Sequence, residues 1–194
     1  MPEKTMRERM LAGEPYIADD PELARDAQRA MDLTHRINTT HPNAADELRA
    51  LFGELLGELG EGAEIRPPFR CDYGYQTRVG ARTFANFGLV VLDVATVTIG
   101  ADVQIGPNVQ LLTATHPLEP GPRRDKWEAA EPIVIEDNVW LGGGVVVCPG
   151  VTIGADTVVG AGSVVTRDLP PRSVAVGSPA RVVRTLVDDT DTPT

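Results

Sequence analysis

The stretch Ile133–Val165, IVIEDNVWLGGGVVVCPGVTIGADTVVGAGSVV, repeats a simple pattern every six residues. An aliphatic residue returns at each sixth position, an apolar or small residue stands two positions before it, and glycine often follows it directly. Neither an α-helix nor an ordinary alternating strand has this period. It is typical of a hexapeptide β-helix, in which each short strand forms one face of a prism and three hexapeptides complete one coil.

The same aliphatic column begins further upstream. Its nine in-phase members are Ile99, Ile105, Leu111, Ile135, Leu141, Val147, Ile153, Val159 and Val165. We expect this column to point into the prism, the small residue to lie near the corner, and the glycine to relieve crowding at the turn. An all-β sandwich with regular turns is the alternative fold, but nine positions in phase disfavour it.

The repeat loses its phase in two places. The segment RTFANFGLVVLDVA, residues 82–95, does not hold the period cleanly, and Asp93 lies six positions before Ile99, where an aliphatic residue is expected. After Leu111 the repeat stops at TATHPL, residues 113–118, and a proline-rich and charged run follows, EPGPRRDKWEAAEP. Long insertions on rigid scaffolds often carry function. We therefore predict an extruded loop at about residues 112–132, with His116 at its root.

Residues 1–60 predict a helical segment in front of the repeat. Thr5 and Glu8 have the spacing of a capping box, and Gly13 is suited to end that short helix. Asp20 precedes a proline, which indicates an N-cap and the first position of a second helix. Asn43 is expected to cap a third helix that carries apolar residues as far as Leu59.

Composition limits the class of protein. The 194 residues suffice for one or two domains, and a net charge of -10 argues against nucleic-acid binding as the main activity. The two cysteines have no metal-type spacing, so we expect no disulfide framework and no metal site. No stretch has the length and apolarity of a signal sequence or a membrane span, which favours a soluble, cytoplasmic protein. The acidic end, DDTDTPT at residues 188–194, is predicted to be disordered.

Several motifs together resemble the maltose/galactoside O-acetyltransferase family, and the maltose type most closely. They are FRCDYGYQTRVG at 69–80, FANF at 84–87, TATHP at 113–117, NVWLGG at 138–143 and GSPAR at 177–181. The resemblance implies a mainly β fold, with a left-handed parallel β-helix over residues 61–187 behind the helical segment. It also implies a homotrimer that uses acetyl-coenzyme A as a co-substrate, with no permanently bound cofactor, and a small sugar as the acceptor.

By this resemblance, His116 is the catalytic residue. An imidazole is suited to take the proton from a sugar hydroxyl while that oxygen attacks the acetyl thioester. Asn86 is expected to contact the acceptor and to help orient the reacting groups, its alternative being a turn residue whose amide bonds to local backbone. Asp20, Asp72 and Asp93 are also expected to bind the acceptor. Each aspartate also has a structural alternative: Asp20 as an N-cap with Asp19 facing the acceptor instead, Asp72 as an exposed loop residue, and Asp93 as a buried, paired carboxylate.

The resemblance places the acetyl-coenzyme A site on the later coils. The main chain at Gly143 is expected to stabilise the oxyanion of a tetrahedral intermediate. Arginines in this acidic chain suit the phosphates of the co-substrate. The residues assigned to this site are Trp140, Gly143, Ala161, Thr166, Arg167, Arg181 and Arg184. Cys148 is expected to be a small packing residue.

The predicted activity is acetyl transfer to a hydroxyl of a glucosyl or maltose-type sugar. Another acceptor, such as a galactoside, a chitooligosaccharide or an amino-sugar, is the nearest alternative, because a β-helix does not fix its own chemistry. A β-helical carbonic anhydrase would need three histidines around zinc, and only His116 belongs to the coils, since His35 and His41 are in the helical segment. A non-catalytic scaffold is the remaining alternative.

Overall fold

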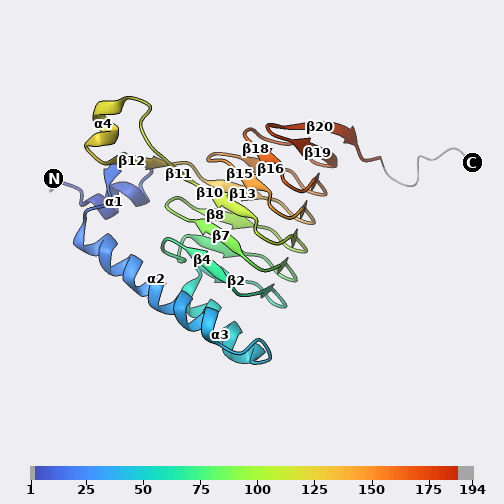
Figure 1. Ribbon diagram of the computed structural model, residues 1–194, viewed down its shortest axis with the longest axis horizontal. Coiled ribbons are helices and arrows are strands. Elements are labelled where there is room, and N and C mark those ends of the chain that lie inside the picture. The colour runs from blue at the N-terminus through green and yellow to red at the C-terminus, as the bar shows by residue number, and fades with distance from the viewer. Residues whose placement is uncertain (1–2, 188–194) are drawn as a thin grey trace, which may run out of the picture.

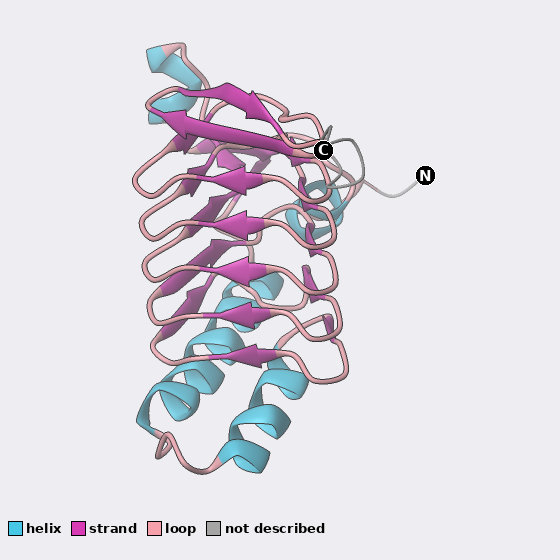
Figure 2. Cartoon of the chain, turned by 90° about the vertical axis from the view of Figure 1, so that its right-hand side faces the viewer, coloured by secondary structure: helices cyan, strands magenta, loops and turns pink. Residues whose placement is uncertain are grey.

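The computed structural model describes residues 3–187, and the predicted disordered tail at 188–194 lies outside the described residues. The chain winds into a prism whose coils each add one strand to each of three parallel sheets, stacked like rungs (Figure 1, Figure 2). This confirms the predicted β-helix of hexapeptide repeats.

The three sheets follow one another along the chain in the order I, II, III. Sheet I contains β2 (Glu58–Leu59), β5 (Thr77–Val79), β8 (Val97–Ile99), β13 (Ile133–Ile135) and β16 (Thr152–Ile153). Sheet II contains β3 (Glu64–Ile65), β6 (Phe84–Ala85), β9 (Gln104–Ile105), β14 (Trp140–Leu141), β17 (Val158–Val159), β19 (Ser173–Gly177) and β20 (Ala180–Thr185), of which β20 turns back antiparallel to β19. Sheet III contains β4 (Phe69–Cys71), β7 (Leu89–Leu92), β10 (Gln110–Leu112), β15 (Val146–Val147) and β18 (Val164–Val165).

The aliphatic column forms the core of the prism, and its nine predicted members are at most 2% exposed. The residues two positions earlier are equally buried, from Val97 and Val103 to Thr157 and Ser163, so this second column lines the core as well. A fully buried aliphatic side chain contributes about 1.5–3 kcal/mol relative to an exposed one. The two columns together therefore account for most of what holds the coils in register.

The glycines allow successive coils to approach each other closely. A Cβ atom added at Gly142 would lie 2.5 Å from the backbone nitrogen of Ala161 on the next coil. Glycine therefore relieves crowding between the backbones of two successive coils.

The loss of phase near Asp93 has a geometric cause. Val79, Ala85 and Val91 are six apart, and Val91 pairs in register with Leu111, so the column continues through this segment. The next member, Ile99, follows Val91 by eight residues because the corner from sheet III to sheet I is two residues longer here. The sequence interpretation that put Asp93 at an aliphatic position was wrong: Asp93 belongs to the enlarged corner.

Two helices of the N-terminal segment, α2 (Pro21–Thr39) and α3 (Ala45–Leu55), lie beneath the coils and cover their open lower end, whereas α1 (Met6–Leu11) lies beside the coils near the loop (Figure 1, Figure 2). The capping box of Thr5 with Glu8 and the N-cap at Asp20 are confirmed. Apolar residues of α2 and α3, such as Ile37 and Phe52, join the same core as Ile65 and Phe69 of the first coil.

The prediction for the third helix was wrong at both ends. Ala44 is the N-cap residue of α3 and makes no side-chain cap, while the backbone of Asn43 donates to His41 Nδ1 at 3.1 Å. The helix ends at Leu55, because Glu58 and Leu59 already pair with β5 as the first strand of sheet I. The β-helix therefore begins slightly before residue 61.

The predicted loop leaves the prism after β10 and folds back on itself. It forms β11 (Ala114–Thr115), the short helix α4 (Pro120–Arg124) and β12 (Trp127–Ala130), and β12 pairs on its other side with β1 (Tyr16–Ile17). The resulting three-stranded sheet joins the N-terminal segment to the loop, although the two are far apart in sequence (Figure 1).

Candidate active site at two corners of the prism

The corner between sheets III and I, called the III–I corner below, carries several of the residues that the sequence assigns to the acceptor and to catalysis. Asp72 directly follows β4, Asp93 follows β7, and the loop with His116 follows β10. These strands pair in register, Cys71 with Val91 and Val91 with Leu111, so the three segments leave the prism one above another. The structure thus brings Asp72, Asp93 and the root of the His116 loop to one corner.

The root of the loop is tied to the coil below it. The Thr113 side chain is fully buried, and its hydroxyl accepts from the backbone N–H of Ala95 at 3.0 Å. Across the root, the backbone N–H of Glu131 donates to the Thr113 carbonyl at 3.0 Å. His116, three residues further on, is exposed but is held close to a fixed point of the scaffold.

Asp93 has the geometry of the structural alternative. Its side chain is completely buried, one oxygen accepts from the backbone N–H of Tyr73 at 2.9 Å, and the other accepts from the Thr77 hydroxyl at 3.1 Å. These bonds fix the turn that presents Asp72. A direct contact between Asp93 and the acceptor stays a prediction.

Asp72 lies half-buried beside two other carboxylates. Its pKa is raised to about 6, mainly by burial and also by the negative charges of Asp93 and Glu128. A carboxylate in such a place gains from a hydrogen-bond donor brought by a ligand.

Glu128 and Tyr16 belong to this corner but were missed in the sequence. Tyr16 is 1% exposed, and its hydroxyl donates to Glu128 Oε2 at 2.8 Å. The two residues are 112 positions apart, and in the sequence nothing distinguishes Glu128 from the other charged residues of its segment. Only the pairing of β1 with β12 reveals the contact.

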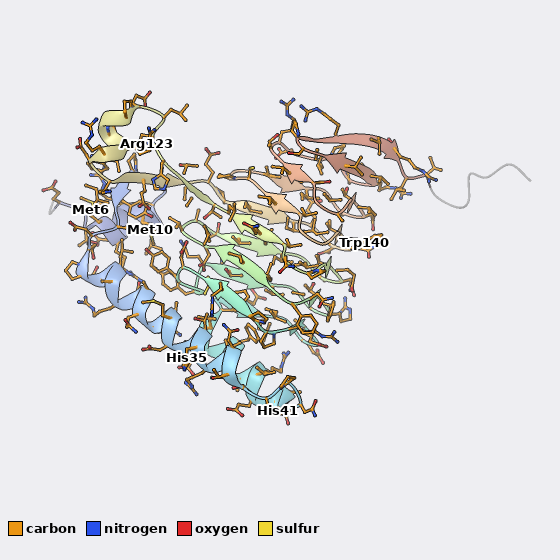
Figure 3. All side chains as sticks on the ribbon, viewed as in Figure 1. Met6, Met10, His35, His41, Arg123 and Trp140 are labelled. Carbon is orange, nitrogen blue, oxygen red and sulfur yellow. The ribbon has the colours of Figure 1, made fainter. Side chains whose placement is uncertain are left out.

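An apolar cluster packs the N-terminal segment against the loop. Met10, Tyr16, Leu23, Tyr73 and Val94 form its buried part, and Ala114 and Ala130 of the loop strands pack on it. Figure 3 shows Met6 and Met10 on this side of the molecule, away from Trp140. The N-terminal segment therefore packs against the loop strands and supports them through this apolar cluster.

Asp20 is confirmed as a helix cap. One carboxylate oxygen accepts from the backbone of Glu22 at 2.7 Å and Leu23 at 3.3 Å, and the other accepts from Met6 at 3.2 Å. Both oxygens are thus engaged by backbone donors. Acceptor binding by Asp20 stays a prediction.

A second set of predicted residues lies at the corner between sheets II and III, called the II–III corner below. Asn86 follows β6, Gly143 lies just after β14, and Ala161 lies just after β17. The Asn86 amide oxygen accepts from the backbone N–H of Phe87 at 2.8 Å. Trp140, on β14 of sheet II, is 56% exposed, which leaves its ring open to a ligand.

The remaining residues assigned to the co-substrate lie at the upper end of the prism. Thr166 and Arg167 follow β18 at the III–I corner, whereas Arg181 and Arg184 belong to β20 at the edge of sheet II. Arg167, Arg181 and Arg184 are exposed. Cys148 packs against the core of the prism as a partly buried residue, as expected.

The two corners are separated by the width of sheet III. Its strands are two to four residues long, so at ~3.3 Å per residue their extended part alone spans roughly 7–13 Å. Within one chain, His116 and Asn86 therefore belong to opposite edges of sheet III, and Gly143 belongs to the same edge as Asn86.

A cavity lies at the lower end of the II–III corner, where Arg66 and Phe87 line it, and the other features lie away from both corners. This cavity, of about 890 Å³, opens between the α2–α3 turn and the first coil, with Arg49 and Phe52 also among its wall residues. His35 and His41 lie along the helices at the base (Figure 3). Among residues 3–187, no group of three or more His, Cys, Asp and Glu is arranged to hold a metal ion. Over the same residues, no helix is long and apolar enough to cross a membrane.

Two protein-family models match the sequence. The maltose acetyltransferase hexapeptide capping motif matches residues 9–60, which include the helices at the base. The bacterial transferase hexapeptide, with six repeats, matches residues 132–167.

Known proteins match over nearly the whole chain. Nodulation protein L of Rhizobium meliloti is 50% identical over 179 residues, which are 92% of this chain and 98% of that protein. The crystal structure of a maltose O-acetyltransferase from Clostridium difficile 630 is 41% identical, with a TM-score of 0.94 and coverage of 95% of this chain and 99% of the other. A hexapeptide-repeat containing acetyltransferase from Vibrio cholerae O1 biovar eltor, complexed with acetyl coenzyme A, is 43% identical, with a TM-score of 0.89 and coverage of 95% and 100%.

Proposed function

Because this chain belongs to the maltose/galactoside O-acetyltransferase family of hexapeptide-repeat proteins, we propose that it acetylates a hydroxyl of a glucosyl or maltose-type sugar. It is an acetyl-coenzyme A-dependent acyltransferase, and acetyl-coenzyme A is its co-substrate. The observation that carries the proposal for this chain is the stacking of Asp72, the Asp93 turn and the His116 loop at one corner. A histidine beside groups able to bind hydroxyls is what transfer to a sugar requires.

In the proposed reaction, His116 accepts the proton of the sugar hydroxyl as that oxygen attacks the thioester carbonyl. The carbonyl oxygen becomes an oxyanion, and the backbone N–H of Gly143 donates to it. When the carbon–sulfur bond breaks, His116 returns the proton to the departing thiolate. Atoms and charges balance without an acyl-enzyme.

The acceptor is placed by the III–I corner. Asp72 accepts hydrogen bonds from sugar hydroxyls, which compensates the burial that raises its pKa to about 6. Asp93 holds the turn that presents Asp72, through the Tyr73 backbone. Asn86 of the II–III corner orients the reacting groups from the other side.

The proposed assembly is a homotrimer. The III–I corner of one copy faces the II–III corner of the next, so that each interface joins His116 of one chain to Asn86 and Gly143 of its neighbour. A head-to-tail contact of this kind closes into a ring when the rotation permits. The distance between the two corners within one chain supports this arrangement.

The test of the activity is release of coenzyme A thiol from acetyl-coenzyme A with glucose, maltose, a galactoside, a chitooligosaccharide and an amino-sugar. We expect the highest kcat/KM with glucose or maltose. A clear preference for a different acceptor would redirect the proposal within the family. If the folded protein released no coenzyme A thiol with any of these sugars, the remaining alternative would be a non-catalytic scaffold.

The test of the mechanism is His116→Ala. We expect kcat to fall by a factor of about 10² to 10⁴, the usual contribution of general base catalysis. An unchanged fold is checked by circular dichroism. Retention of most activity, or a burst of acetylated enzyme without acceptor, would contradict direct transfer through His116.

A further inference from the structure

The three-stranded sheet of the loop pairs Tyr16 with Glu128 on one side of β12, and His116 directly follows β11 on the other side. Tyr16 pairs with Glu128 between β1 and β12, and Thr115 pairs with Ala129 between β11 and β12. Continuing this antiparallel register by one residue sets His116 opposite Glu128. Residues directly opposite on neighbouring strands point to the same face, with Cβ atoms about 4.5–5.5 Å apart.

Tyr16 fixes the Glu128 carboxylate from behind. The Tyr16 ring is 1% exposed in the apolar cluster, and its hydroxyl donates to Glu128 Oε2 at 2.8 Å. Burial and this hydrogen bond raise the pKa of Tyr16 far above its ordinary value, so the hydroxyl stays a donor. A carboxylate accepts at two oxygens, and the bond at Oε2 leaves Oε1 for a donor on the other side.

A general-base histidine benefits from such a neighbour. When one ring nitrogen takes a proton from the substrate, a carboxylate at the other ring nitrogen orients the ring and stabilises the imidazolium that forms. Besides Tyr16, the groups that act electrostatically around Glu128 are Asp72 and Tyr73, while Arg9 stacks on the neighbouring Trp127. Asp93 adds a further negative charge at Asp72. Apart from Arg9, the groups named around Glu128 are carboxylates and phenols.

We infer that Glu128 orients His116 during acetyl transfer and that Tyr16 is a positioning residue that holds Glu128 in place. The inference rests on the proposed function, since it assigns His116 as the base. It extends that function by giving the N-terminal segment, through β1, a part in catalysis.

The experiment compares Glu128→Gln, Tyr16→Phe and the double variant. We expect Glu128→Gln to lower kcat about tenfold with less than a threefold change in acceptor KM, and Tyr16→Phe to lower kcat about threefold. The acid limb of the pH profile of kcat/KM moves to lower pH in both. Because Tyr16 acts through Glu128, the double variant is no slower than Glu128→Gln alone.

Two matched controls separate this role from packing. Tyr75→Phe removes a hydroxyl that donates to Asp26 beside the same apolar cluster, and Glu119→Gln neutralises a carboxylate on the same loop. Both are expected to keep wild-type kcat and pH profile. The inference would be overturned if the kcat losses of the two single variants multiplied in the double variant. It would also be overturned if the acid limb of the kcat/KM profile did not move in Glu128→Gln.

A second measurement does not depend on activity. The chain has three histidines, so the imidazole signal of His116 is assigned in an NMR titration by its absence from His116→Ala. Its midpoint is expected to move to lower pH in Glu128→Gln and to stay in Glu119→Gln. Equal midpoints would refute the orienting role even if thiol release with sugars shows the proposed function to be correct, and a shifted midpoint with no thiol release would sink only the proposed function.

Discussion

Asp72 is a single residue at the III–I corner whose charge costs stability. Its pKa is raised to about 6, mainly by burial, with Asp93 and Glu128 adding to the effect. The ionised form is therefore disfavoured in the folded protein relative to the unfolded chain. In the proposed function, a sugar hydroxyl that donates to Asp72 would relieve this cost, which is a common one at binding sites.

The stability of the protein is predicted to depend on this carboxyl group. With a raised pKa, Asp72 contributes stability below its ordinary pKa near 4, and this contribution is lost as pH rises through about 6. Asp72→Asn is thus expected to gain on the order of 1 kcal/mol over wild type between pH 4 and 7, after allowing for partial exposure. Urea unfolding of both proteins across this range measures the difference.

Asp102→Asn is the control with the opposite sign. The hydrogen bond from Arg82 lowers the pKa of Asp102, so its contribution is present at neutral pH and is lost as pH falls. The difference between wild type and Asp102→Asn should shrink on acidification. A pH-independent difference for Asp72→Asn would contradict the assignment of a raised pKa.

At the scale of elements, each coil is held by aliphatic packing inside and by backbone approach at the glycines. A Cβ atom at Gly80 would lie 2.5 Å from the carbonyl oxygen of Gly100 on the next coil. At Gly53, which is exposed in the last turn of α3, a Cβ atom would meet nothing within 4 Å. The two glycines thus differ in what an added methyl group encounters.

Substitution by alanine is predicted to have opposite effects at these two positions. Gly80→Ala forces two coils apart and should lower the free energy of unfolding by about 1–3 kcal/mol. Gly53→Ala should raise it by about 0.5–1 kcal/mol, because alanine favours a helix and nothing obstructs it. Denaturant midpoints measure both changes, and a neutral Gly80→Ala would show that the coils tolerate separation.

The sequence predicts a feature of these elements correctly when the residues that form it are close together in the chain. The core column and the caps at Thr5 and Asp20 follow from residues close together in the chain, and the sequence predicts them correctly. The bond between Tyr16 and Glu128 depends on a strand pairing across 112 positions, for which no local pattern exists. The failed cap at Asn43 shows the same limit, since the turn beside the first coil decides where α3 begins.

At the scale of the whole molecule, the separation of the two corners gives the proposed trimer a sharp genetic test. His116→Ala and Asn86→Ala are each expected to be inactive alone. Co-assembled in one trimer, they recreate an interface with an intact His116 from one chain and an intact Asn86 from its neighbour. In a three-membered ring one interface in three has this combination.

Activity of purified mixed trimers should therefore recover to about one third of the wild-type rate. Two different affinity tags allow mixed trimers to be isolated after co-expression, and light scattering should give three times the 20.8 kDa chain mass. If both residues acted from the same chain, every chain would carry one defect. Mixed trimers would then be as inactive as the separate variants.

At the III–I corner, the length of the connecting segment varies from coil to coil while the packing of the core stays the same. From one sheet III strand to the next sheet I strand, the column steps by eight residues after Cys71 and after Val91, and by twenty-four after Leu111, yet the strands stay in register. Segments of different length thus connect the same two sheets here while the coils keep their register. Because the proposed function places the acceptor at this corner, grafting these segments from relatives offers a practical means of redirecting the enzyme.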